Sequence, residues 1–263
     1  MKIVADNTIP FLKGVAEPSA EVVYLPAKGF TPEAIKDADA LIVRSIDKCT
    51  PQLLEGSKVK LITTATIGFD HIDTHFCDAH GITWKNAPGC NASSVAQYVI
   101  SSLLVLAKRE GSACLKGKSI GIIGVGHVGK QVERLASLLG MRVLRNDPPR
   151  AEKEGGREFF SLDEVLEEAD VVTLHVPYTL EGEYPTCHLA GKSFFEKMKP
   201  GCWFVNSCRG AVHDTAALLD AYRAGVVKEM VIDCWENEPN IDIDLLQASS
   251  IATPHIAGFS ADG

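Results

Sequence analysis

Three short polar segments near the end of the chain carry side chains suited to acid–base chemistry on a bound anion. They are residues 206–210 with Arg209, residues 233–239 with Glu238 and residues 253–258 with His255. Arginine binds a carboxylate through two parallel hydrogen bonds, histidine titrates near neutral pH, and a carboxylate can orient a histidine and stabilise its imidazolium. We therefore predict Arg209, Glu238 and His255 as catalytic residues.

Each of these segments follows a short apolar, strand-like run, at residues 202–205, 229–232 and 250–252. The carboxyl ends of the strands in an open parallel sheet line its ligand crevice. Three such runs would bring the three side chains to one edge. Together with a nucleotide site upstream, this arrangement predicts hydride transfer on a 2-hydroxy acid.

The upstream site is a glycine loop between a strand at residues 119–123 and a helix. Gly124 permits a tight turn, Gly126 lets the backbone approach a pyrophosphate, and Gly129 lets helix and strand pack closely. The helix amino terminus, which includes His127 and Val128, would present N–H groups to the phosphates.

The cofactor prediction depends on Asp147, which lies at the end of the next strand. A carboxylate there can bind both ribose hydroxyls and would repel a 2′-phosphate, which favours NAD over NADP. Arg145 and Arg150 lie nearby and would favour NADP, but Asp147 carries more weight.

Strand and helix signals alternate along the whole chain, which predicts parallel sheets covered by helices. Residues 93–108 form a long, mostly apolar helical run between two alternating sets. We predict an α/β protein with two doubly wound parallel-sheet domains: a flavodoxin-like substrate domain at 1–95 and a Rossmann NAD-binding domain at 96–263. The predicted strands are 2–5, 22–25, 40–44, 61–65, 82–86, 119–123, 142–146, 171–175, 202–206, 229–233 and 250–253.

Composition narrows the class of protein further. The 263 residues are 46% hydrophobic, enough for a sizeable core, and the net charge of −8 argues against nucleic acid and anionic membranes as partners. The amino terminus lacks a signal-peptide pattern, and the eight cysteines form no Cys-x-x-Cys pair. We expect a cytoplasmic protein with reduced thiols.

These motifs together resemble the D-isomer-specific 2-hydroxyacid dehydrogenases over essentially the whole chain. The resemblance implies that Arg209 binds substrate, that Glu238 orients the histidine and that His255 transfers the proton. It also implies NAD contacts at His175, Pro177, Cys208, Asp233 and Gly258, with Asp233 near the nicotinamide amide.

Finer motifs, at residues 43–45, 64–73, 87–92 and 147–150, resemble a branch of the family that oxidises 4-phospho-D-erythronate, a small phosphorylated 2-hydroxy acid. The resemblance implies substrate contacts at Ser45, Thr66 and position 259. That position is Phe259 where tyrosine is expected, and phenylalanine cannot donate a hydrogen bond to the substrate. Arg44 and Lys48 are candidate phosphate partners.

Alternatives stay open at this point. The chain could act on 3-phosphoglycerate or on glyoxylate and hydroxypyruvate, or it could be an NAD-sensing binding protein like the corepressors of this family. A zinc site formed by His71, His75, Cys77 and His80 is disfavoured, because hydride transfer needs no metal here. The family pattern also leads us to expect that a returning helix and a C-terminal dimerisation domain are missing, with a homodimer for the full-length parent.

Overall fold

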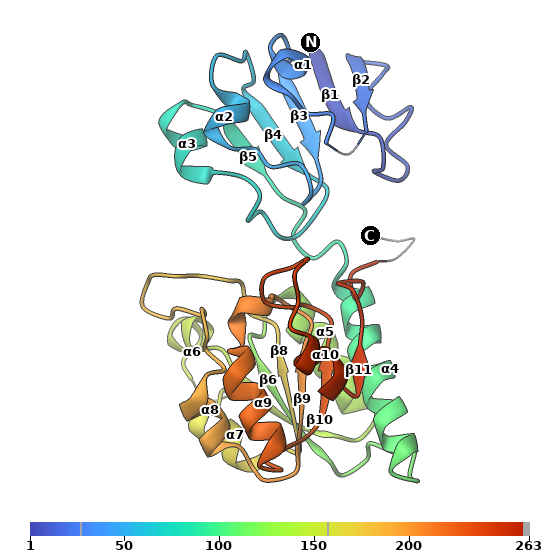
Figure 1. Cartoon of the computed structure of the whole chain (residues 1–263), viewed down its shortest axis with the longest axis vertical. Coiled ribbons are helices and arrows are strands. Elements are labelled where there is room, and N and C mark those ends of the chain that lie inside the picture. Colours follow the sequence, from blue (N-terminus) through green and yellow to red (C-terminus); the bar gives the residue numbers. More distant parts are fainter. Residues whose placement is uncertain (27, 157, 260–263) are drawn as a thin grey trace. The chain divides into compact units, whose positions relative to one another are not determined.

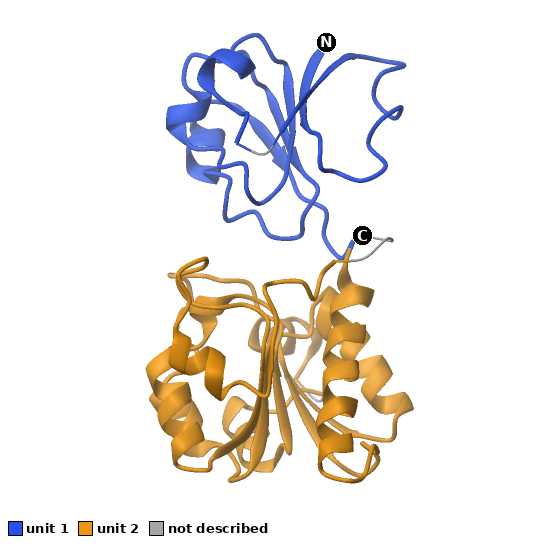
Figure 2. Cartoon of the chain, turned by 45° about the vertical axis from the view of Figure 1, so that its right-hand side comes forward, with its two compact units in different colours: residues 1–90 blue, residues 91–263 orange. Residues whose placement is uncertain are grey.

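The computed structural model describes residues 1–26, 28–156 and 158–259 and divides the chain into two compact units (Figure 2). Unit 1 is Met1–Cys90 and unit 2 is Asn91–Gly263. The sequence placed the domain boundary at 95/96, inside the long helix. The two compact units divide at 90/91, before that helix, whose buried residues from Val95 to Ala107 pack within unit 2.

Unit 1 is built on a parallel sheet with the strand order β2-β1-β3-β4-β5 (Figure 1). This is the order 2-1-3-4-5 of flavodoxin-like folds. Its elements are β1 (Lys2–Asp6), β2 (Glu21–Leu25), α1 (Pro32–Ile35), β3 (Ala40–Val43), α2 (Pro51–Leu54), β4 (Leu61–Thr64), α3 (Thr74–Ala79) and β5 (Thr83–Lys85). Ile35, Leu54 and Cys77 pack from the helices onto Leu41 and Ile62 of the sheet.

Unit 2 contains a second parallel sheet, ordered β11-β10-β9-β8-β6-β7. Its elements are α4 (Ala92–Arg109), β6 (Ser119–Ile123), α5 (His127–Leu138), β7 (Arg142–Asn146), α6 (Pro148–Glu154), α7 (Leu162–Glu168), β8 (Val171–Leu174), α8 (Lys192–Lys197), β9 (Cys202–Asn206), η1 (Gly210–Val212), α9 (Thr215–Arg223), β10 (Val227–Ile232), α10 (Ile243–Ala248) and β11 (Ile251–Ala252). The sheet runs outward in both directions from β6 and β8, so the point where strand order reverses lies between them.

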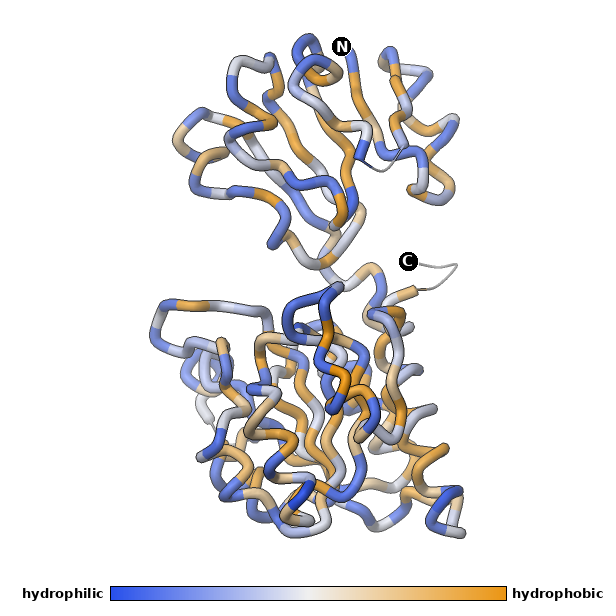
Figure 3. The backbone as a smooth tube through the Cα atoms, viewed as in Figure 1, coloured by the Kyte–Doolittle hydropathy of each residue, from blue (hydrophilic) through white to orange (hydrophobic). Residues whose placement is uncertain are grey.

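Two hydrophobic clusters cover the two faces of the unit 2 sheet. One joins α4 and α5 to the sheet through residues such as Val99, Leu103 and Val132. The other joins α7, α8 and α9 through Leu166, Phe195 and Leu218. β6, β8 and β9 are buried along their whole length, and Figure 3 shows the apolar colour that follows the strands. The polar residues after these strands are therefore held by a rigid support.

Local signals explain where the helices of unit 2 begin. Ser161 and Glu164 form a capping box at the start of α7, and Asp214 caps α9 through the backbone N–H of Ala217. Asp147 caps α6. In the part of the chain that the structure describes, the helices are too short or too polar to cross a membrane.

Candidate active site

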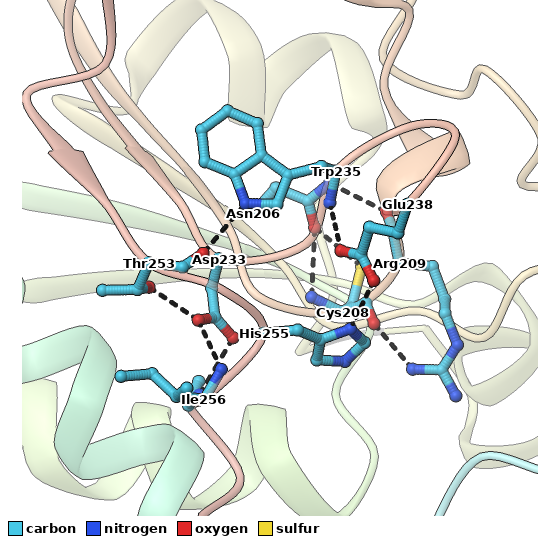
Figure 4. A network of polar contacts seen from close by, with 10 residues as sticks. Asn206, Cys208, Arg209, Asp233, Trp235, Glu238, Thr253, His255 and Ile256 are labelled. Carbon is cyan, nitrogen blue, oxygen red and sulfur yellow. Dashed lines mark hydrogen bonds and ion pairs between the residues drawn. The ribbon is translucent and has the colours of Figure 1, made fainter. Parts of the chain in front are cut away.

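The centre of the candidate site is a hydrogen bond between His255 and Glu238, both in unit 2 (Figure 4). Nδ1 of His255 lies 2.9 Å from Oε2 of Glu238. The other carboxylate oxygen, Oε1, accepts a hydrogen bond of 2.7 Å from the backbone N–H of Trp235. Because Glu238 binds Nδ1 and is itself fixed by Trp235, the Nε2 atom of His255 is left as the atom for proton exchange.

The two side chains shift each other's proton affinity in opposite directions. The hydrogen bond to Glu238 raises the pKa of His255, although burial opposes this. Burial also opposes ionisation of Glu238, but the hydrogen bonds from His255 and Trp235 outweigh it and hold the Glu238 pKa below its usual value. The pair is therefore suited to an imidazolium that forms next to a carboxylate.

Asp233 holds the loop that carries His255. Its fully buried carboxylate accepts hydrogen bonds from Thr253 Oγ1 at 2.6 Å and Ile256 N at 2.8 Å on Oδ1, and from Ala257 N at 2.9 Å on Oδ2. The backbone N–H of His255 also donates to the Asp233 carbonyl. These bonds hold His255 at a φ of 55°, which is uncommon outside glycine.

Further polar contacts tie this loop to its surroundings. The indole N–H of Trp235 donates to the Thr253 carbonyl at 2.8 Å, and the hydroxyl groups of Tyr98, on α4, and Thr253 lie 2.6 Å apart. The loops after β10 and β11 and the helix α4 are thus one hydrogen-bonded assembly.

Arg209 lies on the loop after β9, which is shaped by Asn206. The Asn206 amide donates to the Arg209 carbonyl at 2.8 Å, and its Oδ1 accepts from the backbone N–H of Cys208 at 3.0 Å. The Arg209 guanidinium donates to the Cys208 carbonyl at 2.6 Å. Its charge lowers the pKa of Glu238, so it acts electrostatically on the same pair.

A close backbone contact joins the arginine loop to the glutamate loop. A Cβ added to Gly210 would lie 1.9 Å from the Trp235 carbonyl oxygen and 2.4 Å from Glu236 N. Only glycine fits there, because this approach is far inside van der Waals contact. The position of Arg209 is therefore coupled to that of Glu238 through the backbone.

Beneath the arginine loop lies His213, a fully buried histidine. Its Nδ1 is 2.8 Å from Asn206 Nδ2, and within the described residues its Nε2 is buried without a hydrogen-bond partner. Burial lowers the His213 pKa to about 4. The ring is therefore neutral at physiological pH, and Nδ1 accepts from the Asn206 amide.

The glycine loop after β6 has the shape that a dinucleotide requires. Gly124 has a φ of +87°, and a Cβ there would lie 2.6 Å from the His175 carbonyl oxygen; at Gly129 it would lie 2.2 Å from the Gly124 carbonyl oxygen. A Cβ at Gly126 would meet no atom within 4 Å. Gly126 precedes α5 and cannot cap it with a side chain, so the first-turn N–H groups, including those of His127 and Val128, suit a pyrophosphate.

Asp147 lies beside this loop at the end of β7. Its Oδ2 accepts from Val125 N at 2.8 Å and its Oδ1 from Arg150 N at 3.1 Å. The nearby arginines are already paired, Arg145 with Glu133 and Glu158 and Arg150 with Glu154. Their charges are thus balanced, which weakens the case for a 2′-phosphate partner.

The other predicted NAD contacts follow strands of the same sheet. The ring of His175 bonds Thr173 Oγ1 at 2.9 Å, and burial lowers its pKa to about 3. Pro177 accepts a bond from Thr186. Burial raises the pKa of the Cys208 thiol to about 11. Gly258 packs against Asn91, whose side-chain nitrogen would be 2.2 Å from an added Cβ.

The predicted substrate residues of unit 1 follow neighbouring strands, at the carboxyl ends of β3 and β4. Ser45 is exposed. The Thr66 hydroxyl donates to the Gly68 carbonyl at 2.8 Å and lies 2.8 Å from the Thr64 hydroxyl, which in turn bonds His71 Nε2. Thr66 therefore stabilises its own loop.

The remaining predictions involve Phe259 and the histidines near α3. The Phe259 side chain is exposed, in unit 2. Cys77 is buried in the core, and His80 stacks on Phe76. Among the described residues, no group of three or more His, Cys, Asp or Glu side chains is arranged to hold a metal ion.

Comparisons with known proteins decide the family. The profile of the D-isomer specific 2-hydroxyacid dehydrogenase NAD binding domain matches residues 101–257. The chain belongs to the D-isomer specific 2-hydroxyacid dehydrogenase family. Unit 2 therefore contains the NAD-binding domain of this family, and the chain is an NAD-dependent oxidoreductase with the two parallel-sheet α/β domains that the sequence predicted.

Relatives of known name extend this match to the whole chain. The erythronate-4-phosphate dehydrogenase of Porphyromonas gingivalis is 53% identical over 100% of this chain and 71% of its own length. That of Bacteroides fragilis is 52% identical over 100% of this chain and 76% of its own length. The NAD⁺-bound 3-phosphoglycerate dehydrogenase of Entamoeba histolytica matches with a TM-score of 0.83 and 29% identity, over 100% of this chain and 89% of that chain.

Sequence reasoning missed the residues that position the catalytic candidates. Asn206, Trp235, Thr253 and Tyr98 act mostly through backbone groups or through a single hydroxyl. Such contacts leave little trace in residue type. A signal that could have identified Asn206 is its position as the last residue of a buried strand, directly before the arginine loop.

Proposed function

We propose that this chain catalyses the NAD-dependent oxidation of 4-phospho-D-erythronate to 2-oxo-3-hydroxy-4-phosphobutanoate, a step in pyridoxal 5′-phosphate synthesis. The contact between His255 and Glu238 supports the chemistry. The substrate is supported by relatives named erythronate-4-phosphate dehydrogenase that are up to 53% identical over this whole chain.

In the proposed reaction, Nε2 of His255 removes the hydroxyl proton of the substrate. Glu238 keeps the Nδ1 proton in place and stabilises the imidazolium. Arg209 binds the substrate carboxylate and fixes the orientation of the reacting carbon. When bound, NAD⁺ supplies the hydride acceptor.

The cofactor-binding role is proposed for the glycine loop, with Asp147 binding the ribose hydroxyls. Asp147 accepts one backbone bond on each oxygen, and a carboxylate oxygen has a second lone pair for a hydroxyl. His175, Pro177, Cys208, Asp233 and Gly258 stay predictions of cofactor contacts. Ser45, Thr66 and Phe259 stay predictions of substrate contacts.

A substrate panel tests the proposal directly. The specificity constants for 4-phosphoerythronate, 3-phosphoglycerate and D-lactate are measured from NADH absorbance. We expect 4-phosphoerythronate to be preferred. Equal or better use of 3-phosphoglycerate would indicate that this acid is the substrate instead. NAD binding without turnover of any acid would favour an NAD-sensing protein.

Two predictions about the protein in the cell are also proposals: a cytoplasmic location and a homodimeric assembly. Cell fractionation tests the first, and sedimentation equilibrium tests the second.

A further inference from the structure

Two buried carboxyl groups meet at the carboxyl edge of the sheet in unit 1. Asp6 is the last residue of β1, and Asp47 lies on the turn after β3, the strand that pairs with β1. Their side chains are 0% and 2% exposed. Burial of two acids in contact is costly when both are ionised, because each loses hydration and repels the other.

Each acid uses only one oxygen for ordinary hydrogen bonds. Asp6 Oδ1 accepts from the backbone N–H and the hydroxyl of Thr8, both at 2.6 Å. Asp47 Oδ2 accepts from the backbone N–H of Arg44 at 3.0 Å. Within the described residues, the second oxygens, Asp6 Oδ2 and Asp47 Oδ1, are buried without such a donor. The two carboxyl groups lie close enough to act on each other's pKa.

Together with the contact between the two acids, these bonds form a ring around the turn that carries Ser45. The Arg44 guanidinium donates to the Thr8 hydroxyl at 3.1 Å, and that hydroxyl donates to Asp6. The Asp47 carboxyl accepts from Arg44 N, and the Asp47 N–H donates to the Arg44 carbonyl. The contact between the two acids is the one link in the ring that lacks a donor unless a proton is present.

We propose that Asp6 and Asp47 share one proton, and that this proton holds the turn from Arg44 to Asp47, and with it Ser45, in a single conformation. The pair then carries one negative charge, which faces the Arg44 guanidinium. The proposal of a shared proton depends only on the residues of unit 1, whereas its effect on substrate binding rests on the proposed function.

The proton affinities of the groups agree with this geometry. Burial and the contact with Asp6 raise the pKa of Asp47 to about 6, while the pKa of Asp6 is lowered, chiefly by its hydrogen bonds with Thr8 against the effect of burial. The charged and titratable groups that face the pair are Arg44 and Cys49. Burial raises the pKa of the Cys49 thiol to about 12, so Cys49 stays neutral.

The sign of the pH effect follows from the raised value. The folded Asp47 binds its proton more tightly than the unfolded chain does, since about 6 is above the ordinary 3.8. Its stabilising contribution is therefore complete below about pH 4 and is lost as the pH rises through about 6. Above that, the two carboxylates repel each other and the turn loosens.

Two variants distinguish the effect of the shared proton from the effect of the Asp47 side chain itself. In Asp47→Asn, the amide can donate to Asp6 while its oxygen accepts from Arg44 N, so the ring persists without a titrating proton. In Asp47→Ala, the ring is broken at every pH. Asp37→Asn is the matched control, because Asp37 is an exposed acid of the same unit, paired with Lys58.

The first experiment needs no substrate. Carboxyl ¹³C resonances and urea unfolding of unit 1 are followed from pH 4.5 to 7.5 in the whole chain. For the original sequence and for Asp37→Asn, we expect one acid to titrate near pH 6 and the unfolding constant to rise at least about tenfold with pH. In Asp47→Asn both signals should vanish. Ordinary titration of both acids in the original sequence would overturn the proposal.

The second experiment tests the link to Ser45. The KM for 4-phosphoerythronate in the original sequence, divided by that of Asp47→Asn, should rise severalfold between pH 5.5 and 7.5 with little change in the kcat ratio. Titration of His255 affects both proteins and cancels. A flat KM ratio would overturn the link to substrate. If the chain does not oxidise this acid at all, the proposed function fails, while the unfolding and NMR results still decide whether the proton is shared.

Discussion

The two units arrange polar groups at the carboxyl ends of their strands in different ways. In unit 2, the two carboxylates of the candidate site meet donors: Glu238 meets His255 and Trp235 N, and Asp233 meets three donors of one loop. In unit 1, Asp6 meets a second acid. The comparison teaches that the carboxylates of the unit 2 site are satisfied by complementary donors, whereas the pair proposed in unit 1 needs a proton of its own.

The largest expected effect tests whether proton transfer belongs to unit 2 alone. His255→Ala should lower turnover by roughly 10²–10⁴-fold, because the acid–base group is lost. NAD affinity, measured by calorimetry, should change little. The pH-dependent unfolding of unit 1 should be the same as in the original sequence. Normal turnover would remove His255 from the chemistry and weaken the comparison between the units.

The next effect tests the backbone contact that couples two loops of unit 2. Gly210→Ala places a methyl group against the Trp235 carbonyl and should destabilise unit 2 by roughly 1–3 kcal/mol or more, because neither backbone can yield easily. Activity should fall as well, since Arg209 and Glu238 move apart. Gly191→Ala, where the nearest atom is 3.1 Å away, is the control and should cost less. Equal effects of the two variants would show that the contact relaxes.

Cofactor preference tests the local pairing of charges around Asp147. NAD should bind at least about tenfold more tightly than NADP. With NADP, the Asp147 carboxylate loses its hydrogen bond from the ribose 2′-hydroxyl and repels the 2′-phosphate that replaces it. Calorimetric titration of both cofactors measures the difference. A preference for NADP would mean that Arg145 or Arg150 leaves its glutamate partners to bind phosphate.

The smallest effect is a shift in pH dependence that separates the two units. The hydrogen bond that His255 donates to Glu238 raises the pKa of His255, so oxidation should fall at acid pH as the ring becomes protonated. In Glu238→Gln the imidazolium loses its carboxylate partner, and this acid limb should move to lower pH. The kcat profile from pH 5 to 9 shows it. An unmoved limb would assign the titration to another group.

Much of the fold could be predicted from the sequence because buried strands are continuous apolar runs. The strands 119–123, 142–146 and 202–206 have the predicted bounds. β10 begins earlier than predicted, at Val227, because that residue pairs with Cys202 across the sheet. α8 and α10 were not predicted, since helices of six residues are fixed by packing rather than by periodicity. α3 begins at Thr74 because Asp73 caps it.

The candidate site was predictable to the extent that side-chain type carries the chemistry. Arginine, glutamate and histidine after consecutive strands are informative residues, and the structure joins Glu238 to His255 directly. Asp6 and Asp47 escaped notice because they are far apart in the sequence. Their contact depends on the strand order, which places β1 beside β3. A search for acids at the ends of neighbouring strands would have found them.

The way Asp233 holds the His255 loop has a consequence for hydrogen exchange. Ile256 is 43% exposed, yet its amide and that of Ala257 are bonded to the same buried carboxylate. Neither amide proton can exchange with solvent until its hydrogen bond to the Asp233 carboxylate breaks, and one opening of the loop breaks both bonds. The two amides should therefore exchange slowly and at a common rate, as a single kinetic unit on an otherwise accessible surface loop.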